Sequence, residues 1–253
     1  MKLTHIALIT GALTFAGAAS ATAISGTGLQ NGLNAITDGS FYDVNTSQYN
    51  PDETWEVTSS GASVTRLIFE FAGFENQASF GIYDLATPST KLEIFNGASC
   101  GTADTTCTPA GNLNLVIDGA SNMFSTLYSS AVFSSDQFGY YLTSGAGTFY
   151  SQSALNGDSD SDGVSDDHMV AFAGDGSLDL DINGGTNYKN FAAGEYILAW
   201  EDLVLLGSDR DYSDFVVMVE SVRSVFEPGS MALFGLGIAG LAASRRRQKG
   251  LVA

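Results

Sequence analysis

The sequence contains few basic residues and few prolines. Only 10 Lys and Arg residues stand against 28 Asp and Glu residues in a chain of 253, which gives a formal net charge of −18. Half of the basic residues lie near the two ends of the chain: Lys2, Arg245, Arg246, Arg247 and Lys249. A negative field of this kind repels nucleic acid and attracts cations. We therefore expect no nucleic-acid partner.

Histidine and cysteine are also scarce, which excludes several kinds of site. Only His168 lies outside the first 23 residues, so a multi-histidine metal centre cannot form. Neither a G-x-S-x-G nucleophile elbow nor a Gly-rich phosphate loop occurs. Cys100 and Cys107 enclose a short loop, which favours a local disulfide in an exported chain over a redox or zinc motif. We expect a non-catalytic protein in which His168 is structural.

Helical periodicity is almost absent, except for a weak pattern over residues 120–130. Instead, roughly ten short segments are rich in aromatic and β-branched residues and are separated by Gly, Asn, Asp and Ser turns. These segments are residues 55–57, 64–71, 79–83, 91–95, 113–117, 138–142, 168–172, 178–182, 196–200 and 215–219. The pattern predicts an all-β fold, an antiparallel β-sandwich or jelly roll. Residues 24–50 are polar and turn-like, typical of a weakly ordered lead-in or a short strand with loops.

The first 23 residues have the features of a signal peptide. Lys2 precedes an apolar run over residues 6–19, and two small-x-small cleavage sites follow, Ala19-Ser20-Ala21 and Ala21-Thr22-Ala23. We expect residues 1–23 to direct export. Residues 24–224 are then expected to form one β-sandwich domain, because no linker rich in Pro or Ser divides them.

An acidic segment, NGDSDSDGVSDDH, covers residues 156–168. Asp158, Asp160 and Asp162 alternate and are followed by Gly163, as in the first half of a calcium-binding loop, and Asp166 occupies the ninth position. The bidentate Glu expected at position twelve is replaced by a methionine, so the segment is not an EF-hand. It is either a calcium loop of the kind used in extracellular modules or a flexible acidic linker.

A second acidic segment connects two apolar runs, residues 196–200 and 215–219, that read as a hairpin. The connection carries one basic residue, Arg210, among five acidic ones: Glu201, Asp202, Asp209, Asp211 and Asp214. Folding the hairpin brings like charges together, which favours either full solvation or a bound hard cation. Oxygen ligands of this type suit Ca²⁺ better than Zn²⁺ or Cu²⁺. We predict Ca²⁺ ligands in both acidic segments.

The hairpin segment resembles the C-terminal signature of an uncharacterised β-rich domain family of exported bacterial surface proteins. The residues that carry the resemblance are Trp200, Glu201, Asp202, Asp209, Arg210, Asp211, Tyr212 and Asp214, with weaker similarity at residues 80–84 and 168–172. The resemblance implies a β-rich fold and an exported location. It implies no established reaction.

The last 29 residues have three adjoining parts. Glu227, Pro228 and Gly229 precede a predicted transmembrane helix over residues 229–244, and Arg245, Arg246 and Arg247 follow. Residues 225–253 resemble the PEP-CTERM sorting signal of Gram-negative bacteria, although Phe226 replaces the first proline of that motif. The resemblance implies cleavage by an exosortase-type membrane protease. It also implies a precursor anchored in the inner membrane and a final location at the cell surface or in the extracellular matrix. A plain membrane anchor is the alternative.

These observations favour an exported, non-catalytic surface or matrix protein that is stabilised by Ca²⁺. The alternative is a carbohydrate-binding module of the exopolysaccharide matrix, in which exposed aromatic residues such as Tyr140, Tyr141 and Tyr150 stack on sugars. A glycan-acting enzyme is the third hypothesis, because such enzymes need only two suitably placed carboxyl groups.

Overall fold

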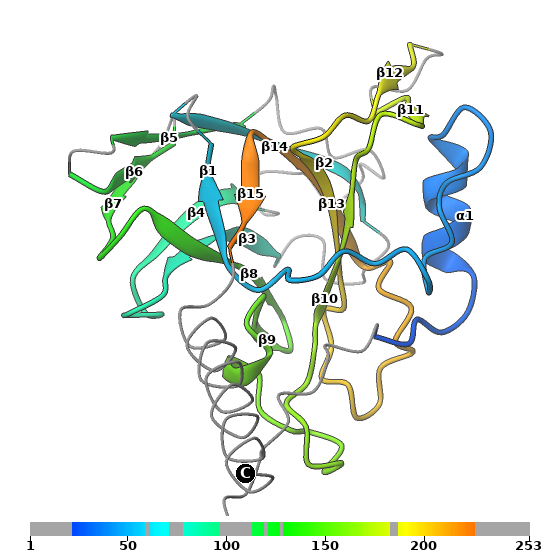
Figure 1. Cartoon of the computed structure of the whole chain (residues 1–253). Helices are drawn as coiled ribbons and strands as arrows, with labels where there is room; N and C mark the ends of the chain where they lie inside the picture. Colours follow the sequence, from blue (N-terminus) through cyan, green and yellow to red (C-terminus); the bar gives the residue numbers. More distant parts are fainter. Residues whose placement is uncertain are drawn as a thin grey trace, which may run out of the picture. The chain divides into compact units, whose positions relative to one another are not determined.

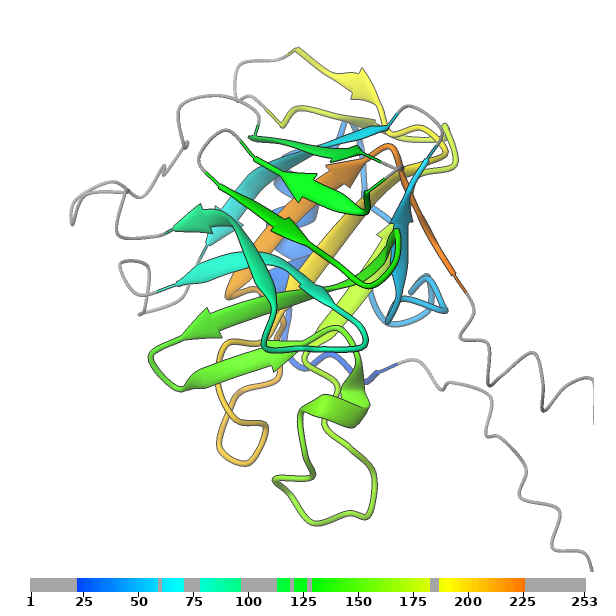
Figure 2. The ribbon, with the colours of Figure 1, turned by 90° about the vertical axis from the view of Figure 1, so that its left-hand side faces the viewer.

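Two antiparallel β-sheets stacked face to face form the framework of the protein (Figures 1 and 2). The computed structural model describes residues 22–58, 61–70, 78–96, 113–118, 121–126, 129–182 and 187–225. These residues belong to one compact unit, Ala21–Glu227. The sandwich and the all-β class predicted from the sequence are confirmed.

The first sheet contains six strands. Its order is β15 (Val222–Ser224), β1 (Trp55–Val57), β8 (Gln137–Ser144), β3 (Ser79–Asp84) and β4 (Lys91–Asn96), and β9 (Gly147–Tyr150) also pairs with β8. Tyr83 of β3 pairs with Gly139 of β8, and the ring of Tyr83 lies against this glycine. A Cβ atom added at Gly139 would lie 2.2 Å from that ring. Glycine is therefore required at this position in β8.

The second sheet contains seven strands. Its order is β10 (Met169–Ala173), β13 (Glu195–Trp200), β14 (Phe215–Glu220), β2 (Ala62–Glu70), β5 (Leu113–Asp118), β6 (Met123–Ser125) and β7 (Ser130–Val132). The short strands β11 (Asp179–Leu180) and β12 (Lys189–Asn190) form a separate ribbon. A 3₁₀ turn, η2 (Ser153–Leu155), follows β9.

Aromatic residues fill the core between the two sheets. Phe80 lies near its centre, with ring centroids 5.5 Å from Tyr140, 6.0 Å from Trp200 and 5.5 Å from Phe215. All four side chains are buried. Large aromatic rings contribute much of the apolar area that stabilises a core of this kind.

A second core lies on the outer face of the seven-stranded sheet, under helix α1 (Gly28–Ala35). Leu29 and Leu33 of α1 pack with Phe172 of β10, Ile197 of β13 and Val216 of β14 (Figure 1). These three strands are consequently buried on both faces. This explains why their sequences are continuous apolar runs rather than alternating ones.

The structure corrects several sequence predictions. The lead-in predicted as weakly ordered or as a short strand contains helix α1, and residues 120–130, which have weak helical periodicity, contain β6 and the start of β7. The predicted signal peptide (except its last two residues), the predicted Cys100–Cys107 disulfide and the C-terminal segment from Phe226 onward lie outside the described residues. Among the residues that are described, no helix is long and apolar enough to cross a membrane.

Candidate metal centre

Three carboxyl groups meet where the β13–β14 hairpin begins its loop. Trp200 at the end of β13 pairs with Phe215 at the start of β14, so the residues just beyond this pair face each other. These residues are Glu201, Asp202 and Asp214, and each offers an oxygen within 4.8 Å of the others. We call them the buried trio.

Hydrogen bonds from distant strands fix the backbone of the buried trio. The Glu201 amide donates to the carbonyl of His168 (3.0 Å), and the Glu201 carbonyl lies 3.1 Å from Nδ1 of His168. The hydroxyl of Ser144, at the end of β8, donates to the Asp202 carbonyl (2.6 Å). Both sheets therefore hold this turn, and its side chains have little freedom to move apart.

The carboxyl groups of the buried trio are removed from water without full compensation. Glu201 is 0% exposed and Asp202 is 4% exposed, whereas Asp214 is half-buried. Among the described residues, neither side-chain oxygen of Glu201 has a hydrogen-bond partner, nor has Oδ2 of Asp202. Asp214 accepts a bond from the Asp202 amide (3.1 Å), and its carboxyl group also interacts with that of Glu201, which has no other donor nearby in the described part of the chain. Buried charged groups without partners are rare because the desolvation cost is large.

Burial and mutual repulsion change the titration of the buried trio. Desolvation, followed by the charge of Asp214, raises the pKa of Glu201 to about 9 and that of Asp202 to about 7. Desolvation also raises the pKa of Asp214. The charge of Asp209 adds to all three shifts. In the absence of a cation, the site therefore favours protonated carboxyl groups.

The other two predicted ligands of the hairpin loop do not join the buried trio. Asp209 is exposed. Asp211 uses Oδ1 to accept bonds from the amide and the hydroxyl of Ser213, at 2.8 and 2.7 Å. Tyr212, the next residue after Asp211, is fully buried. Its hydroxyl donates to the Asp167 carbonyl (2.5 Å), and this bond anchors the loop.

The other acidic segment forms a surface loop (residues 157–166) in which the side chains bond to their own backbone. Asp158 accepts bonds from the amides of Asp162 (3.1 Å) and Gly163 (3.0 Å). Asp166 accepts bonds from the amide and the hydroxyl of Ser159. Asp158, Asp160 and Asp166 offer oxygens within 4.8 Å of one another. Asp162 is not part of that group and instead accepts a bond from the amide of Val164 (2.8 Å).

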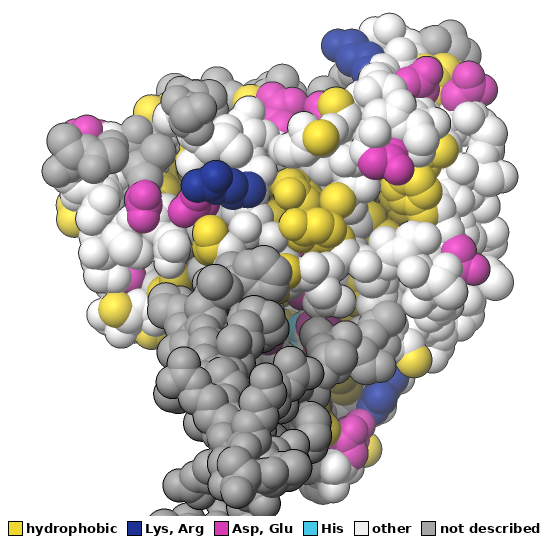
Figure 3. Space-filling view, in the orientation of Figure 1, with side chains coloured by type: hydrophobic (Ala, Val, Ile, Leu, Met, Phe, Trp, Pro, Cys, Tyr) yellow, Lys and Arg dark blue, Asp and Glu magenta, His cyan; other side chains and the backbone are white. Residues whose placement is uncertain are grey.

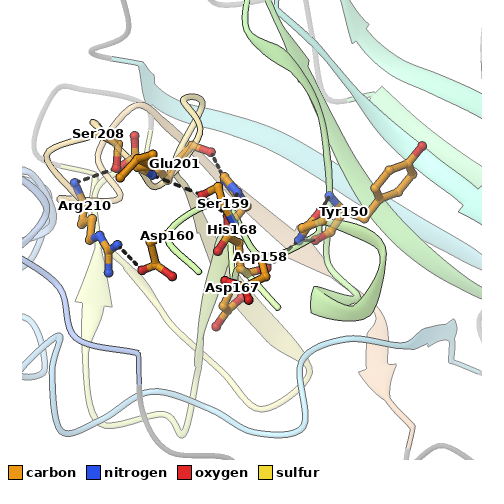
Figure 4. Close-up of polar contacts among 12 residues, drawn as sticks. Tyr150, Asp158, Ser159, Asp160, Asp167, His168, Glu201, Ser208 and Arg210 are labelled. Atoms are coloured by element: carbon orange, nitrogen blue, oxygen red, sulfur yellow. Dashed lines mark hydrogen bonds and ion pairs between the residues drawn. The ribbon is translucent and has the colours of Figure 1, made fainter. Parts of the chain in front are cut away.

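Arg210 brings a positive charge to the surface loop (Figure 4). Its guanidinium group lies 2.6 Å from Oδ2 of Asp160, and this contact lowers the pKa of that carboxyl group. A second contact links the loops, because the amide of Leu206 donates to Oγ of Ser159 (3.2 Å). The two acidic segments thus meet at one end of the sandwich, at the bottom of Figures 1 and 2.

His168 lies between the two segments and is buried. Its ring stacks on Phe149 with centroids 4.0 Å apart, and Nε2 lies 3.9 Å from Oδ2 of Asp166. Desolvation lowers its pKa, so the ring is neutral at physiological pH. Its bond to the Glu201 backbone suits the structural role expected from the sequence.

Sequence reasoning did not single out the residues that position the buried trio. Ser144 lies beyond the predicted strand at residues 138–142 and Tyr212 is only part of the family signature, and nothing in their local sequence distinguishes them. On the face shown in Figure 3, acidic side chains stand singly or in small groups, and some of them lie beside Lys or Arg side chains. The acidic side chains on that face are exposed to solvent and spread over the surface, unlike those of the buried trio.

Comparison with known families gives two matches. Residues 114–222 match the domain of unknown function DUF4114, a segment that runs from β5 to β15 and contains both acidic segments. Residues 227–247 match the PEP-CTERM protein-sorting motif. No curated protein and no solved structure gives a match.

The matches define the class of the protein. A PEP-CTERM motif indicates a protein that is exported, held in the membrane as a precursor and sorted to the surface by an exosortase membrane protease. The chain carries this motif at its C-terminal end and a DUF4114 domain in its body. The resemblances expected from the sequence are confirmed.

Proposed function

We propose that the body of this exported protein is a non-catalytic surface or matrix domain that is stabilised by one Ca²⁺ ion bound to Glu201, Asp202 and Asp214. The observation that carries this proposal is the unpartnered, fully buried carboxyl group of Glu201 beside two further carboxyl groups. Three negative charges this close together repel strongly in a site of low polarity. A divalent cation removes the repulsion and supplies the missing partner.

The donor set favours calcium over other metals. All candidate ligands are carboxylate oxygens, which suit hard cations, and Ca²⁺ accepts irregular oxygen cages more readily than Mg²⁺ does. Calcium sites of extracellular modules bind with Kd values of about 10⁻⁴–10⁻³ M. Folding of the exported body would then be completed in the calcium-containing exterior.

The same geometry argues for a structural role over catalysis. A general acid or base must contact its substrate, but Glu201 has no exposed surface. Its raised pKa is what burial and repulsion produce in any enclosed carboxyl cluster. The buried trio therefore supports the fold better than it supports glycan hydrolysis.

Carbohydrate binding through the tyrosines named above finds no support in their positions. Tyr140 is 0% exposed and Tyr141 is 4% exposed, so the expectation that they are exposed was wrong. Tyr150 is half-buried, and the ammonium group of Lys91 lies 4.8 Å from the centroid of its ring. These rings belong to the sheet and are not a platform for sugars.

Thermal unfolding of the purified exported protein tests the proposal. Free Ca²⁺ at about 100 times its Kd adds about 2.7 kcal/mol to the free energy of unfolding, which raises the Tm by about 5–10 °C relative to EDTA for a body of this size. Mg²⁺ serves as the control and should produce a smaller shift. Identical melting curves in EDTA and in excess Ca²⁺ would overturn the proposal.

A further inference from the structure

Thr22, the first described residue, is held by side chains from two different parts of the body. Its amide donates to Oε1 of Gln48 (2.8 Å), and its carbonyl accepts a bond from Nε2 of Gln48 (2.7 Å). Its hydroxyl donates to Oδ2 of Asp167 (2.5 Å). These three bonds hold Thr22 against Gln48 and the Asp167 carboxyl group, and the hydroxyl is the atom that contacts Asp167.

The surroundings of Asp167 are rich in negative charge. Burial, together with the charge of Glu53, disfavours a charged Asp167 and raises its pKa, and burial with the charges of Asp167 and Glu53 raises the pKa of Asp52. The Arg ion pairs found among the described residues join other groups: Arg210 with Asp160, and Arg223 with Glu56. No Lys or Arg of the described chain pairs with Asp167 or Asp52.

We propose that signal peptidase cleaves between Ala21 and Thr22, and that the new α-ammonium group of Thr22 forms an ion pair with Asp167. An α-amino group has an ordinary pKa of about 7.7–8.0 and carries a positive charge at neutral pH. An amide nitrogen donates one hydrogen bond, whereas an ammonium group donates three. The group can therefore keep its bond to Gln48 and also donate to the carboxylate.

These contacts distinguish the two cleavage sites in the sequence by the stability of the mature chain that each produces. Cleavage after Ala21 keeps all three bonds of Thr22 and places a cation next to Asp167. Cleavage after Ala23 removes Thr22 and leaves Asp167 beside Asp52 with no neutralising group. A mature chain that begins at Thr22 is therefore the more stable product, because it supplies a cation to a carboxylate that otherwise accepts a bond from the Met169 amide (3.3 Å) but has no Lys or Arg partner among the described residues.

Export of the full chain in a Gram-negative host, followed by intact-mass analysis and N-terminal sequencing, tests the cleavage site. We expect a mature chain that begins at Thr22. Ala23→Asp blocks only the second site, and because Ala23 is exposed it should change neither the first residue nor the Tm. A wild-type chain that begins at Ile24 would overturn the proposal.

The ion pair is tested with Ala19→Asp, which blocks only the first site. The product should either remain uncleaved, which shows that the second site is not used, or begin at Ile24 with a Tm lower by about 5 °C. A chain that begins at Ile24 and melts like the wild type would contradict the ion pair.

Asp167→Asn separates the ion pair from a purely structural role. The substitution should lower the Tm of the chain that begins at Thr22 much more than that of the chain that begins at Ile24. Equal losses in both chains would show that Asp167 acts without the ammonium group. If the variant does not fold, selective acetylation of the wild-type α-amine provides the same comparison and should lower the Tm by a similar amount.

Discussion

The two acidic segments contain similar side chains in opposite environments. In the surface loop, Asp158 and Asp166 accept bonds from neighbouring amides, and Asp160 pairs with Arg210. In the buried trio, Glu201 has no partner among the described residues. The sequence of the surface loop is closer to a known calcium motif. A bound cation would nevertheless stabilise the buried trio more, because its carboxyl groups lack hydrogen-bond donors and repel one another. How strongly a carboxyl cluster favours a bound cation depends more on the desolvation of its carboxyl groups than on their spacing in the sequence.

Glu201→Gln is the substitution expected to have the largest effect on this contrast. It removes one charge from the buried trio, so the Ca²⁺-dependent rise of about 5–10 °C in Tm should be lost. The Tm in EDTA should increase because the folded state no longer has to keep a carboxyl group protonated above its ordinary pKa. Thermal melts with and without Ca²⁺ measure both changes.

Asp158→Asn is the matched control, since it removes one charge from the surface loop and keeps one of the two oxygens that accept backbone amides. We expect it to leave the response to Ca²⁺ intact. The reverse result, with the response lost in Asp158→Asn and kept in Glu201→Gln, would move the ion to the surface loop.

The pH dependence of the metal-free protein should show an intermediate effect. The folded-state pKa of Glu201 is raised from 4.5 to about 9, so its contribution to stability is complete below pH 4.5 and is lost as pH rises through 9. The Tm in EDTA should thus fall by several °C between pH 6.5 and pH 9. His168 does not interfere in this window, because its lowered pKa costs stability only below about pH 6.5.

Two comparisons identify the source of that pH effect. Saturating Ca²⁺ should flatten the dependence, because the carboxyl groups then stay ionised. Glu201→Gln should flatten it in EDTA. A metal-free protein whose Tm is constant or increases from pH 6.5 to pH 9 would refute the assignment of raised pKa values to the buried trio.

Asp160→Asn should have the smallest effect. Its partner Arg210 is 40% exposed at the side chain, and ion pairs of this kind contribute little. We expect the Tm to change by about 2 °C or less, with the response to Ca²⁺ unchanged. Chemical denaturation at two salt concentrations measures the contribution of the ion pair. Loss of the response to Ca²⁺ would show that the two acidic segments bind the ion jointly.

The strands were predictable from the sequence because their signal is local. Every predicted segment coincides with or overlaps a strand, since aromatic and β-branched residues suit a pleated, packed surface. The strands that were missed, such as β6 and β9, have only 3 and 4 residues, too few to show a period. Helix α1 was missed because it buries only Leu29 and Leu33 and depends on packing against the sheet.

The candidate site was predictable only in part. Glu201, Asp202 and Asp214 were named because they flank two apolar runs that form a hairpin, and the register of that hairpin brings them together. Asp209 and Asp211 were named for the same reason, but one is exposed and the other bonds to Ser213. Sequence spacing gives no information on where a loop side chain points.

The sequence by itself determined that the chain is exported, β-rich and sorted through its C-terminal motif, because signal segments and strand periodicity are written in neighbouring residues. Tertiary structure alone decided which acidic residues lose contact with water. Ser144 at the end of β8 and His168, just before β10, bond to the backbone of Asp202 and Glu201, and both come from distant parts of the chain. Desolvation is a property of everything that surrounds a group, so no local pattern can specify it.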